Sequence, residues 1–225
     1  MTLQKPRGRA EIGEQRRLRT RGRILRAAAQ VIAEIGTDRA TVDDFIVAAG
    51  VSRGTFYNHF KSQQELLDEL WRIVGREPFL EIGRLCGEIA CPVERFAATT
   101  RMVLMRATVD HTWGWLIVAL SASEATLTDD LRAYPLPDLM AGKHAARFQY
   151  KSEKAAVDLV VGAMRAGLRA LLEGRREAQY PQSLCNMLLL ALGVSQREAQ
   201  RISLLSLTTP YIPKPRQEKN LALLR

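Results

Sequence analysis

The chain has 225 residues, of which 33 are Lys or Arg and 24 are Asp or Glu, so its formal net charge is +9. A hydrophobic fraction of 47% is ordinary for a folded protein and excludes a disordered chain. We expect no membrane span, because no run of about 18 apolar residues occurs, and no secretory signal, because no apolar segment follows the basic N-terminus. Three cysteines are too few for a disulfide scaffold, so we expect a cytoplasmic protein with reduced thiols.

The net charge is concentrated at the N-terminus. Residues 1–26 carry nine basic and two acidic side chains, which leaves an excess of only +2 for the remainder of the chain. Residues 1–19 also lack apolar periodicity and contain Pro6, Gly8 and Gly13, so we expect a flexible basic arm. Such asymmetry is typical of a protein that contacts a polyanion, either nucleic acid or an anionic membrane surface.

The residues after the arm predict two helices. Apolar residues at intervals of three or four over residues 24–35 predict a helix that starts near Thr20 and ends at Gly36. Thr41, with an acidic residue three positions later, is the expected N-cap of a second helix. Gly50 ends that helix after about eight residues.

Two more helix starts follow at once. Ser52 is the expected N-cap of a third helix that runs to about Phe60, and Ser62 and Glu65 form a capping box for a fourth helix. Closely spaced helix starts of this kind predict a compact three-helix head joined to a longer helix.

The remainder of the chain stays helical, so the predicted fold class is all-α. Apolar stripes predict a helix over 66–89 with a break near Pro78, and further helices over 92–107, 111–120, 124–133, 152–173, 180–192 and 195–206. Ser195 and Glu198 are expected to form a capping box for the last helix. We expect a loop over 134–150 and a loosely held tail over 210–225, because both segments contain several prolines.

Residues 41–60 carry the informative motif. Two short capped helices joined by a tight turn at Gly50 predict a helix-turn-helix. Apolar residues of the motif would hold the two helices together, which leaves small and donor-rich side chains on the outer surface of the second helix. Such side chains suit a helix that reads a DNA groove.

Together with its flanking helices, the motif resembles the TetR family of bacterial transcriptional regulators. The matching pattern comprises Arg23-Ile24-Leu25, Ala28, Gly36, Thr41-Val42, Ala49-Gly50-Val51-Ser52, Gly54-Thr55-Phe56-Tyr57, His59-Phe60 and Glu65-Leu66-Leu67. Beyond it the resemblance rests on the helix count and on residues 191–199. The chain departs from the family pattern at Phe45-Ile46 and at Gln63, which replaces a frequent Lys and leaves Lys61 as a substitute phosphate contact.

The resemblance implies DNA-binding roles for particular side chains. Thr41 and Tyr57 would bind phosphates, with Thr55, His59 and Lys61 as helpers. Arg53, Gly54 and Asn58 would face the major groove, with Ser52 at the start of the reading helix. The arm, closest to the head at residues 16–23, would add phosphate or minor-groove contacts.

The resemblance also implies four parts: a basic arm (1–19), a helix-turn-helix DNA-binding domain (20–66), an effector-binding and dimerisation domain (67–209) and the tail (210–225). The candidate effector pocket consists of Phe96, Met102, Met105, His111, Trp113, Trp115 and Leu116. Aromatic residues and methionines suit an apolar or aromatic ligand. The alternative is that these residues form ordinary core, and Trp113 and Trp115 are about 200° apart on a helix, so they cannot both face one pocket.

Dimerisation is expected from the helix over 152–173, which is apolar nearly all round. Gly162, Ala166 and Ala170 recur at four-residue steps and would permit close approach of another helix. With the helix over 180–192 it would form an interface across a two-fold axis. The alternative is that both helices are intramolecular core.

The predicted function is therefore a homodimeric repressor that a small-molecule effector releases from a palindromic DNA operator. An activator of the same fold and a basic helical protein on a membrane surface are the alternatives; the arm has few apolar residues to insert into lipid. No catalytic motif and no paired metal-ligand motif occurs, so we expect no enzymatic activity, no cofactor and no bound metal.

Overall fold

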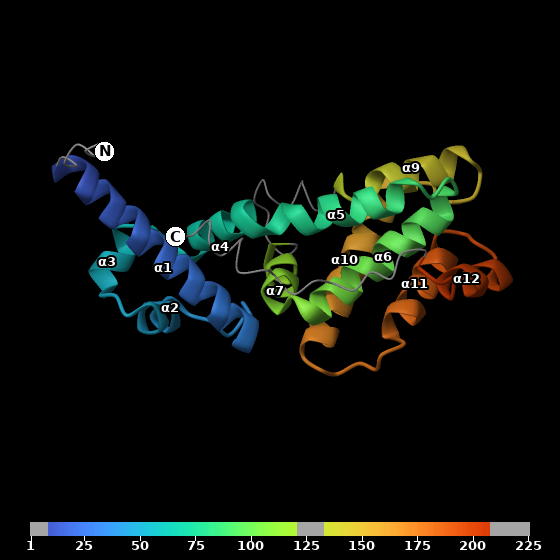
Figure 1. Cartoon of the computed structure of the whole chain (residues 1–225). Coiled ribbons are helices and arrows are strands. Elements are labelled where there is room, and N and C mark those ends of the chain that lie inside the picture. The colour runs from blue at the N-terminus through green and yellow to red at the C-terminus, as the bar shows by residue number, and fades with distance from the viewer. Residues whose placement is uncertain (1–8, 121–132, 208–225) are drawn as a thin grey trace, which may run out of the picture. The chain divides into compact units, whose positions relative to one another are not determined.

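The computed structural model describes residues 9–120 and 133–207, and every regular element in these ranges is a helix (Figure 1). The predicted all-α class is confirmed. The described residues fall into two compact units, a head that ends at Ile73 and a body that begins at Val74. The helix predicted over 124–133 and the tail after Pro210 lie almost wholly outside the described residues.

The head contains four α-helices: α1 (Arg9–Ile35), α2 (Val42–Ala49), α3 (Arg53–Tyr57) and α4 (Gln63–Leu70). Helix α1 packs against α2 and α4, and α2 packs against α3. Large apolar side chains from all four helices and the adjoining turns form the core: Ile24, Leu25, Ile32, Phe45, Phe56, Phe60, Leu66 and Leu70.

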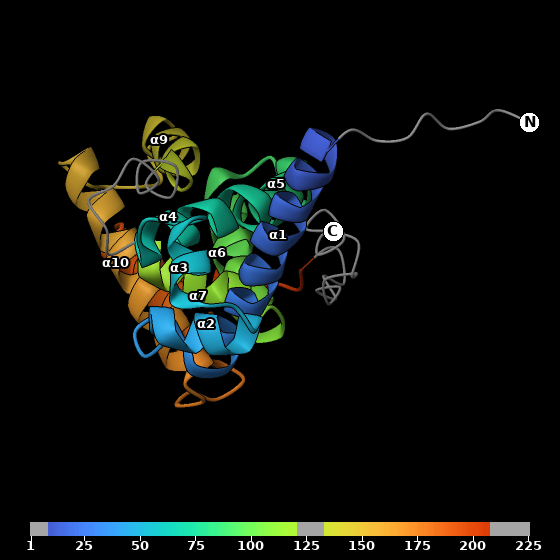
Figure 2. The same cartoon turned by 90° about the vertical axis from the view of Figure 1, so that its left-hand side faces the viewer.

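The prediction of a flexible arm is wrong for residues 9–19, which belong to α1. This helix begins at Arg9, well before the expected start near Thr20, and Figure 2 shows it as one continuous helix. Residues 9–19 are rich in Arg, Gln, Glu and Ala, which are strong helix formers. The missing apolar periodicity has another cause: side chains 13–19 are exposed or half-buried, so this part of the helix covers no core.

The predicted start and end of α2 are confirmed. The Asp44 N–H donates to the Thr41 hydroxyl at 3.3 Å, and the Thr41 N–H donates to the Asp44 carboxylate at 2.8 Å, which together make a capping box. The pKa of Asp44 is lowered because its carboxylate accepts hydrogen bonds from the Thr41 hydroxyl, at 2.7 Å, and from the Thr41 N–H. Gly50 ends the helix in the left-handed region with φ of 59°, which favours glycine.

The next two helices start as predicted but differ in detail. The Ser52 hydroxyl accepts from the Thr55 N–H at 3.1 Å, yet α3 ends at Tyr57, before the expected end near Phe60. The Ser62 hydroxyl accepts from the Glu65 N–H at 3.1 Å. The Glu65 carboxylate, however, accepts from the Lys61 N–H at 2.7 Å, so the expected return bond to Ser62 is replaced.

The predicted break near Pro78 lies about one turn earlier than expected. Helix α4 is followed by the π-helical turn η1 (Trp71–Gly75) and then by α5 (Arg76–Gly87), which contains Pro78 in its first turn. A proline ring crowds the carbonyl four residues earlier and offers it no N–H. That carbonyl belongs to Val74, inside η1, so the distortion falls before the proline.

The body is organised around α6 (Pro92–Val109), which packs against α5, α7 (His111–Leu120), α9 (Leu136–His144), α10 (Glu153–Leu172), α11 (Tyr180–Ala191) and α12 (Gln196–Ser203). As predicted, Pro92 lies in the first turn of α6. The Ser152 hydroxyl caps α10, and Gly174 follows that helix with φ of 67°. In the described part of the chain, no helix is both long and apolar enough to cross a lipid bilayer.

Two predictions for the body are wrong. The segment expected to be a loop contains α9, because Pro135 and Pro137 lie at its start, where proline is tolerated. Gly142 lies inside this helix because a Cβ there would come within 2.2 Å of the Phe148 ring. Ser195 makes no capping hydrogen bond, and the Glu198 carboxylate instead pairs with Arg147.

Candidate nucleic-acid interface and effector cavity

The outer face of α3 carries the side chains predicted to read DNA. Arg53, Gly54, Tyr57 and Asn58 are exposed, whereas Thr55 and His59 are half-buried. The opposite face is anchored by Phe56, which is fully buried and meets the Tyr57 ring edge-on at 5.4 Å between centroids. Of the other predicted contacts, Thr41, Ser52 and Lys61 are also exposed.

Arg53 is held by a weak internal partner. Its Nη1 lies 3.2 Å from the Asp43 carboxylate, and both side chains are 66% exposed. Its guanidinium carbon also lies 6.0 Å from the centroid of the Tyr57 ring. Exposed ion pairs contribute about 0–1 kcal/mol. A phosphate or a guanine edge can therefore replace Asp43 at small cost.

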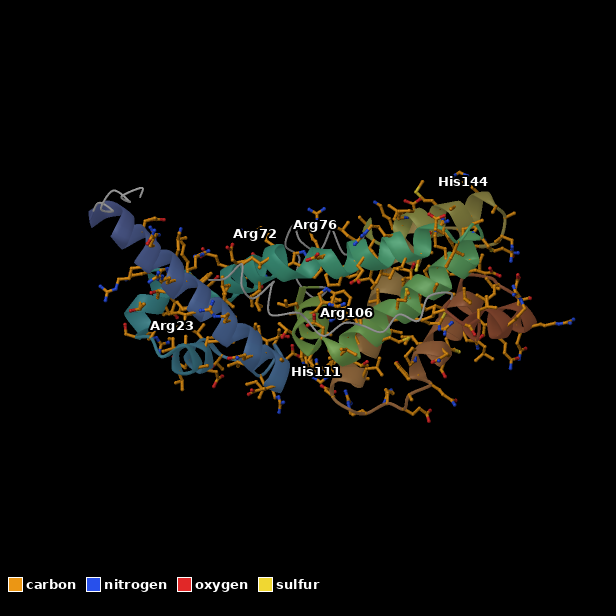
Figure 3. The ribbon with its side chains drawn as sticks, in the orientation of Figure 1. Arg23, Arg72, Arg76, Arg106, His111 and His144 are labelled. Atoms are coloured by element: carbon orange, nitrogen blue, oxygen red, sulfur yellow. The ribbon has the colours of Figure 1, made fainter. Side chains whose placement is uncertain are left out.

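Arg21 has a structural role that the sequence did not indicate. Its Nη1 donates to the His59 carbonyl at 2.5 Å, and its Nη2 lies 3.7 Å from the Glu69 carboxylate. The guanidinium carbon lies 4.2 Å from the centroid of the Phe60 ring. Arg21 thus ties α1 to the segment between α3 and α4. The arginines left exposed on this part of α1 are Arg16, Arg17, Arg19 and Arg23, the last of which is labelled in Figure 3.

His59 is biased towards its neutral form. Burial lowers the pKa of His59, and the positive charges of Arg17 and Arg21 lower it further. Its Nδ1 is buried and has no hydrogen-bond partner among the described residues. A neutral imidazole donates one hydrogen bond rather than two, so His59 would be a modest phosphate ligand.

Gln63, a departure from the family pattern, has a definite contact. Its side-chain amide donates to the Ala40 carbonyl at 3.1 Å, directly before the N-cap Thr41. Gln63 therefore connects the start of α4 to the start of α2. Gln63 lacks the charge of the Lys that is frequent at this position. Its hydrogen bond instead helps to hold the neighbouring Thr41, a predicted phosphate ligand, in place.

The body contains a cavity with about 580 Å³ of empty space, part of it open to solvent. The lining residues come from five helices, and the apolar ones include Phe79, Phe96, Val103, Ile117, Val160 and Met164. The polar lining residues are Thr99, Thr100, Tyr134, Asp138 and Arg165. An apolar site with a few convergent polar groups is typical of a small-molecule pocket.

Asp138 provides the acidic group of this cavity. Its carboxylate accepts from Arg95 Nε at 2.6 Å, and its side chain is 14% exposed. Burial raises the pKa of Asp138, and the Arg95 guanidinium opposes that shift. The Tyr134 and Phe79 rings lie 4.3 Å apart between centroids. The cavity thus combines an aromatic wall with a hydrogen-bond acceptor.

Comparisons with known proteins decide the family. The family model described as "Bacterial regulatory proteins, tetR family" matches residues 24–70. The model described as "Tetracyclin repressor-like, C-terminal domain" matches residues 91–204, about half of the chain. The chain belongs to the TetR family.

Curated relatives match over part of the chain. The HTH-type transcriptional repressor KstR2 of Mycobacterium tuberculosis H37Rv is 37% identical over 75 residues, which cover 33% of this chain and 38% of that repressor. The uncharacterized HTH-type transcriptional regulator YvdT of Bacillus subtilis is 44% identical over 45 residues, or 20% of this chain and 23% of that regulator. The chain thus matches well under half the length of these relatives.

Solved structures share the fold over most of the chain. RolR in complex with resorcinol has a TM-score of 0.68 at 24% identity, covering 87% of this chain and 98% of RolR. FadR of Bacillus subtilis in complex with stearoyl-CoA has a TM-score of 0.57 at 20% identity, covering 77% of this chain and 97% of FadR. At these identities the likeness shows the TetR fold.

In this TetR-family body, the predicted pocket residues are dispersed. Among the seven, Phe96 lines the cavity described above. Trp113, Trp115 and Leu116 are buried on α7, where Trp113 Nε1 donates to the Gly75 carbonyl at 2.8 Å. The other three lie apart from that cavity: Met102 lines a second one, Met105 is half-buried and His111 is exposed at the start of α7.

Several residues that line this cavity were not predicted from the sequence. Asp138 and Tyr134 lie in the segment that was expected to be a loop, and Arg165 lies on α10, for which only a dimerisation role was expected. The signal that could have found Asp138 is the pair of prolines before it, read as a helix start rather than as a loop. In the described ranges, no group of three or more potential ligand side chains could hold a metal ion.

Proposed function

We propose that the chain is a transcriptional repressor that acts in the cytoplasm as a homodimer on a palindromic operator and leaves it when an effector binds. The observation that carries this proposal is the exposed, donor-rich face of α3 in a TetR-family head. Arg53, Gly54 and Asn58 would read the major groove. Thr41 and Tyr57 would bind phosphates and fix the register, with help from Lys61 and the exposed arginines of α1.

The test is selection of bound sequences from a random duplex pool, followed by titration of the enriched site. A two-fold symmetric consensus with half-sites about one helical turn, or a multiple, apart is expected from a dimer. Arg53→Ala should weaken binding by about 1–3 kcal/mol and relax the preference at one base pair. Arg197→Ala, which removes the same charge from an exposed position on α12, is the matched control. A pool in which no sequence is enriched would contradict the proposal.

The proposed dimer interface uses α10 and α11. Leu159 on α10 is 43% exposed and Met187 on α11 is 62% exposed, so each of these helices presents a large apolar side chain on its outer surface. Gly162 and Ala166 are exposed on the same side of α10 as Leu159, whereas Ala170 is buried, so the expected stripe of small residues is shorter than predicted. These exposed residues favour an intermolecular role over the alternative of intramolecular core.

Sedimentation velocity of charged variants tests the interface. The double variant Leu159→Asp, Met187→Asp should sediment as a monomer, because two carboxylates would be buried without partners in the proposed interface. Leu80→Asp is the control, since Leu80 is 61% exposed on α5, outside the proposed surface. If the double variant remained dimeric, a different surface would have to form the dimer.

The proposed effector is a small aromatic compound with a hydroxyl group. Phe79, Phe96 and Tyr134 offer ring contacts, while the Asp138 carboxylate and the Thr100 hydroxyl are available to a ligand donor. Resorcinol, the compound bound to RolR, has this chemistry. Calorimetry with a panel of phenols should give binding to the wild-type chain and about tenfold weaker binding to Asp138→Asn, the loss expected from a charge-assisted hydrogen bond. Glu153→Gln, an exposed change on α10, is the control.

A further inference from the structure

A second cavity lies in the body between α5, α6 and the residues that follow α12. It contains about 510 Å³ of empty space, part of it open to solvent. Its lining is mostly apolar, with Leu85, Ile89, Met102 and Leu205 among the lining residues. No described residue lines both this cavity and the effector cavity, so the two are separate sites.

The unusual feature of the second cavity is a buried cation. Arg101 on α6 lines the cavity and is only 6% exposed. Its Nη1 donates to the Leu205 carbonyl at 2.6 Å, but its Nε is buried without a hydrogen-bond partner. Burial lowers the pKa of Arg101, as expected for a desolvated charge. Within the described ranges Arg101 has no ion pair, and the carboxylate that lines the same cavity, Glu94, pairs with Arg201 at 3.0 Å.

Arg106, one turn and a half further along α6, shows how the same helix treats another buried arginine. It is also 6% exposed, and it lies in the body as labelled in Figure 3. Its two terminal nitrogens lie 3.4 Å from the Glu81 carboxylate and 3.5 Å from the Asp110 carboxylate. A buried guanidinium normally needs such partners, because an isolated buried charge costs several kcal/mol. Among the described residues, Arg106 has two carboxylate partners and Arg101 has none.

The hydrogen bond to the Leu205 carbonyl compensates part of the positive charge of Arg101. Leu205 follows the end of α12 at Ser203, and a helix C-terminus carries about half a negative charge. A guanidinium has five N–H donors, of which this carbonyl takes one. An anion in the cavity would satisfy the remaining donors and the remaining positive charge.

We propose that the second cavity binds the carboxylate of a small amphiphilic acid, with Arg101 as the anion ligand and the apolar lining as the site for the hydrocarbon part. The Ser206 hydroxyl, at the same cavity, is a second donor for the carboxylate. A monocarboxylic acid with a short alkyl chain fits this combination, whereas an inorganic anion would leave the apolar lining without a partner. The site is independent of the DNA-binding face and of the effector cavity.

Calorimetry of the full chain with octanoate tests the proposal. Octanoate should bind the wild-type chain and raise its unfolding temperature. Arg101→Met, which keeps an unbranched apolar stem but removes the guanidinium, should weaken octanoate binding at least tenfold and abolish the rise in unfolding temperature. Arg101→Lys keeps the charge without the planar fork and should bind with intermediate affinity. Arg197→Met, an exposed change on α12, should behave like the wild type.

Two other probes separate the contributions of charge and chain. Acetate has the carboxylate without the chain and should bind far more weakly than octanoate. 1-Octanol has the chain without the charge and should not distinguish the wild type from Arg101→Met.

Equal octanoate affinity in the wild type and Arg101→Met would overturn the proposal, as would octanoate binding that depends on Asp138 instead. The wild type could also fail to bind octanoate while Arg101→Met is only less stable. In that case the role of Arg101 would be to stabilise the end of α12, and the proposal would be overturned. None of these measurements uses DNA, so their failure is distinct from failure of the proposed repressor function.

Discussion

The head and the body are both helical, but their helices begin in different ways. In the head, α2, α3 and α4 have 8, 5 and 8 residues, and each is opened by a Thr or Ser hydroxyl that accepts a backbone N–H. In the body, Ser152 opens α10 in the same way, but α6, α9, α11 and α12 begin without such a hydrogen bond. The head is therefore specified by local signals and the body by packing around α6.

Helix length and packing together explain the difference: α9 and α12 have only 9 and 8 residues and no capping hydrogen bond, but both pack against α6. Isolated helices shorter than about 12–15 residues are marginal in water, so the short helices of the head need capping at their ends. The body has helices of up to 20 residues, and these bury continuous apolar faces against α6. A DNA-reading helix must leave one face free of core contacts, which makes capping the natural way to hold it.

The largest effect is expected from a substitution that creates a cavity in the core of the body. Phe148 is 2% exposed, meets the Phe96 ring edge-on at 5.6 Å and lies against Gly142. Phe148→Ala should lower the free energy of unfolding by about 3–5 kcal/mol. Met140→Ala, on the helix α9 that carries Gly142 but 41% exposed, is the control for denaturant unfolding. Similar losses in both variants would mean that packing does not dominate the body.

A backbone change in the head comes next. Gly50 has φ of 59°, and a Cβ there would meet no atom within 4 Å, so Gly50→Ala tests backbone strain without a clash. We expect a loss of about 1–2 kcal/mol of unfolding free energy. Gly54→Ala is the contrast, because Gly54 has no positive φ. It should leave head stability unchanged or raised while weakening DNA binding.

The caps themselves give the sharpest comparison between head and body. Thr41→Ala should destabilise the head by about 1 kcal/mol, the usual cost of losing an N-cap. Ser195→Ala should leave the body unchanged, since Ser195 makes no capping hydrogen bond. Hydrogen exchange of the amides in α2 and α12, measured without DNA, reports the two effects separately. Equal protection changes in both helices would contradict the inference that caps hold the head helices and packing holds the body helices.

The smallest effect concerns pH. The pKa of His59 is lowered in the folded head, chiefly by burial, so between the folded and unfolded values the unfolded chain binds more protons. Head stability should therefore be complete above the ordinary histidine pKa of about 6.5 and fall as the pH drops below it. His59→Gln should flatten that fall in urea unfolding at pH 7 and pH 5. The exposed His144→Gln should leave it in place.

The same contrast explains what could be predicted from sequence. Thr41, Gly50 and Ser52 act on residues two to four positions away, so their roles were readable from the sequence alone. Glu198 looked like half of a capping box, yet it pairs with Arg147, which is 51 residues away. Helix α9 and Asp138 were missed for a related reason: prolines carry different meanings at a helix start and in a loop, and only packing against α6 decides between them.

The exposed pair of Arg53 and Asp43 has a consequence for target search. Any DNA that recruits Arg53 must first displace the Asp43 carboxylate. A single, poorly aligned phosphate offers little more than Asp43 already does, whereas a guanine edge offers two parallel acceptors. If the chain binds DNA as proposed, Asp43 would therefore weaken binding to random sequence without contacting a base. Substitutions of Asp43 would then change the sequence discrimination of the proposed repressor while Arg53, Gly54 and Asn58 stay the same.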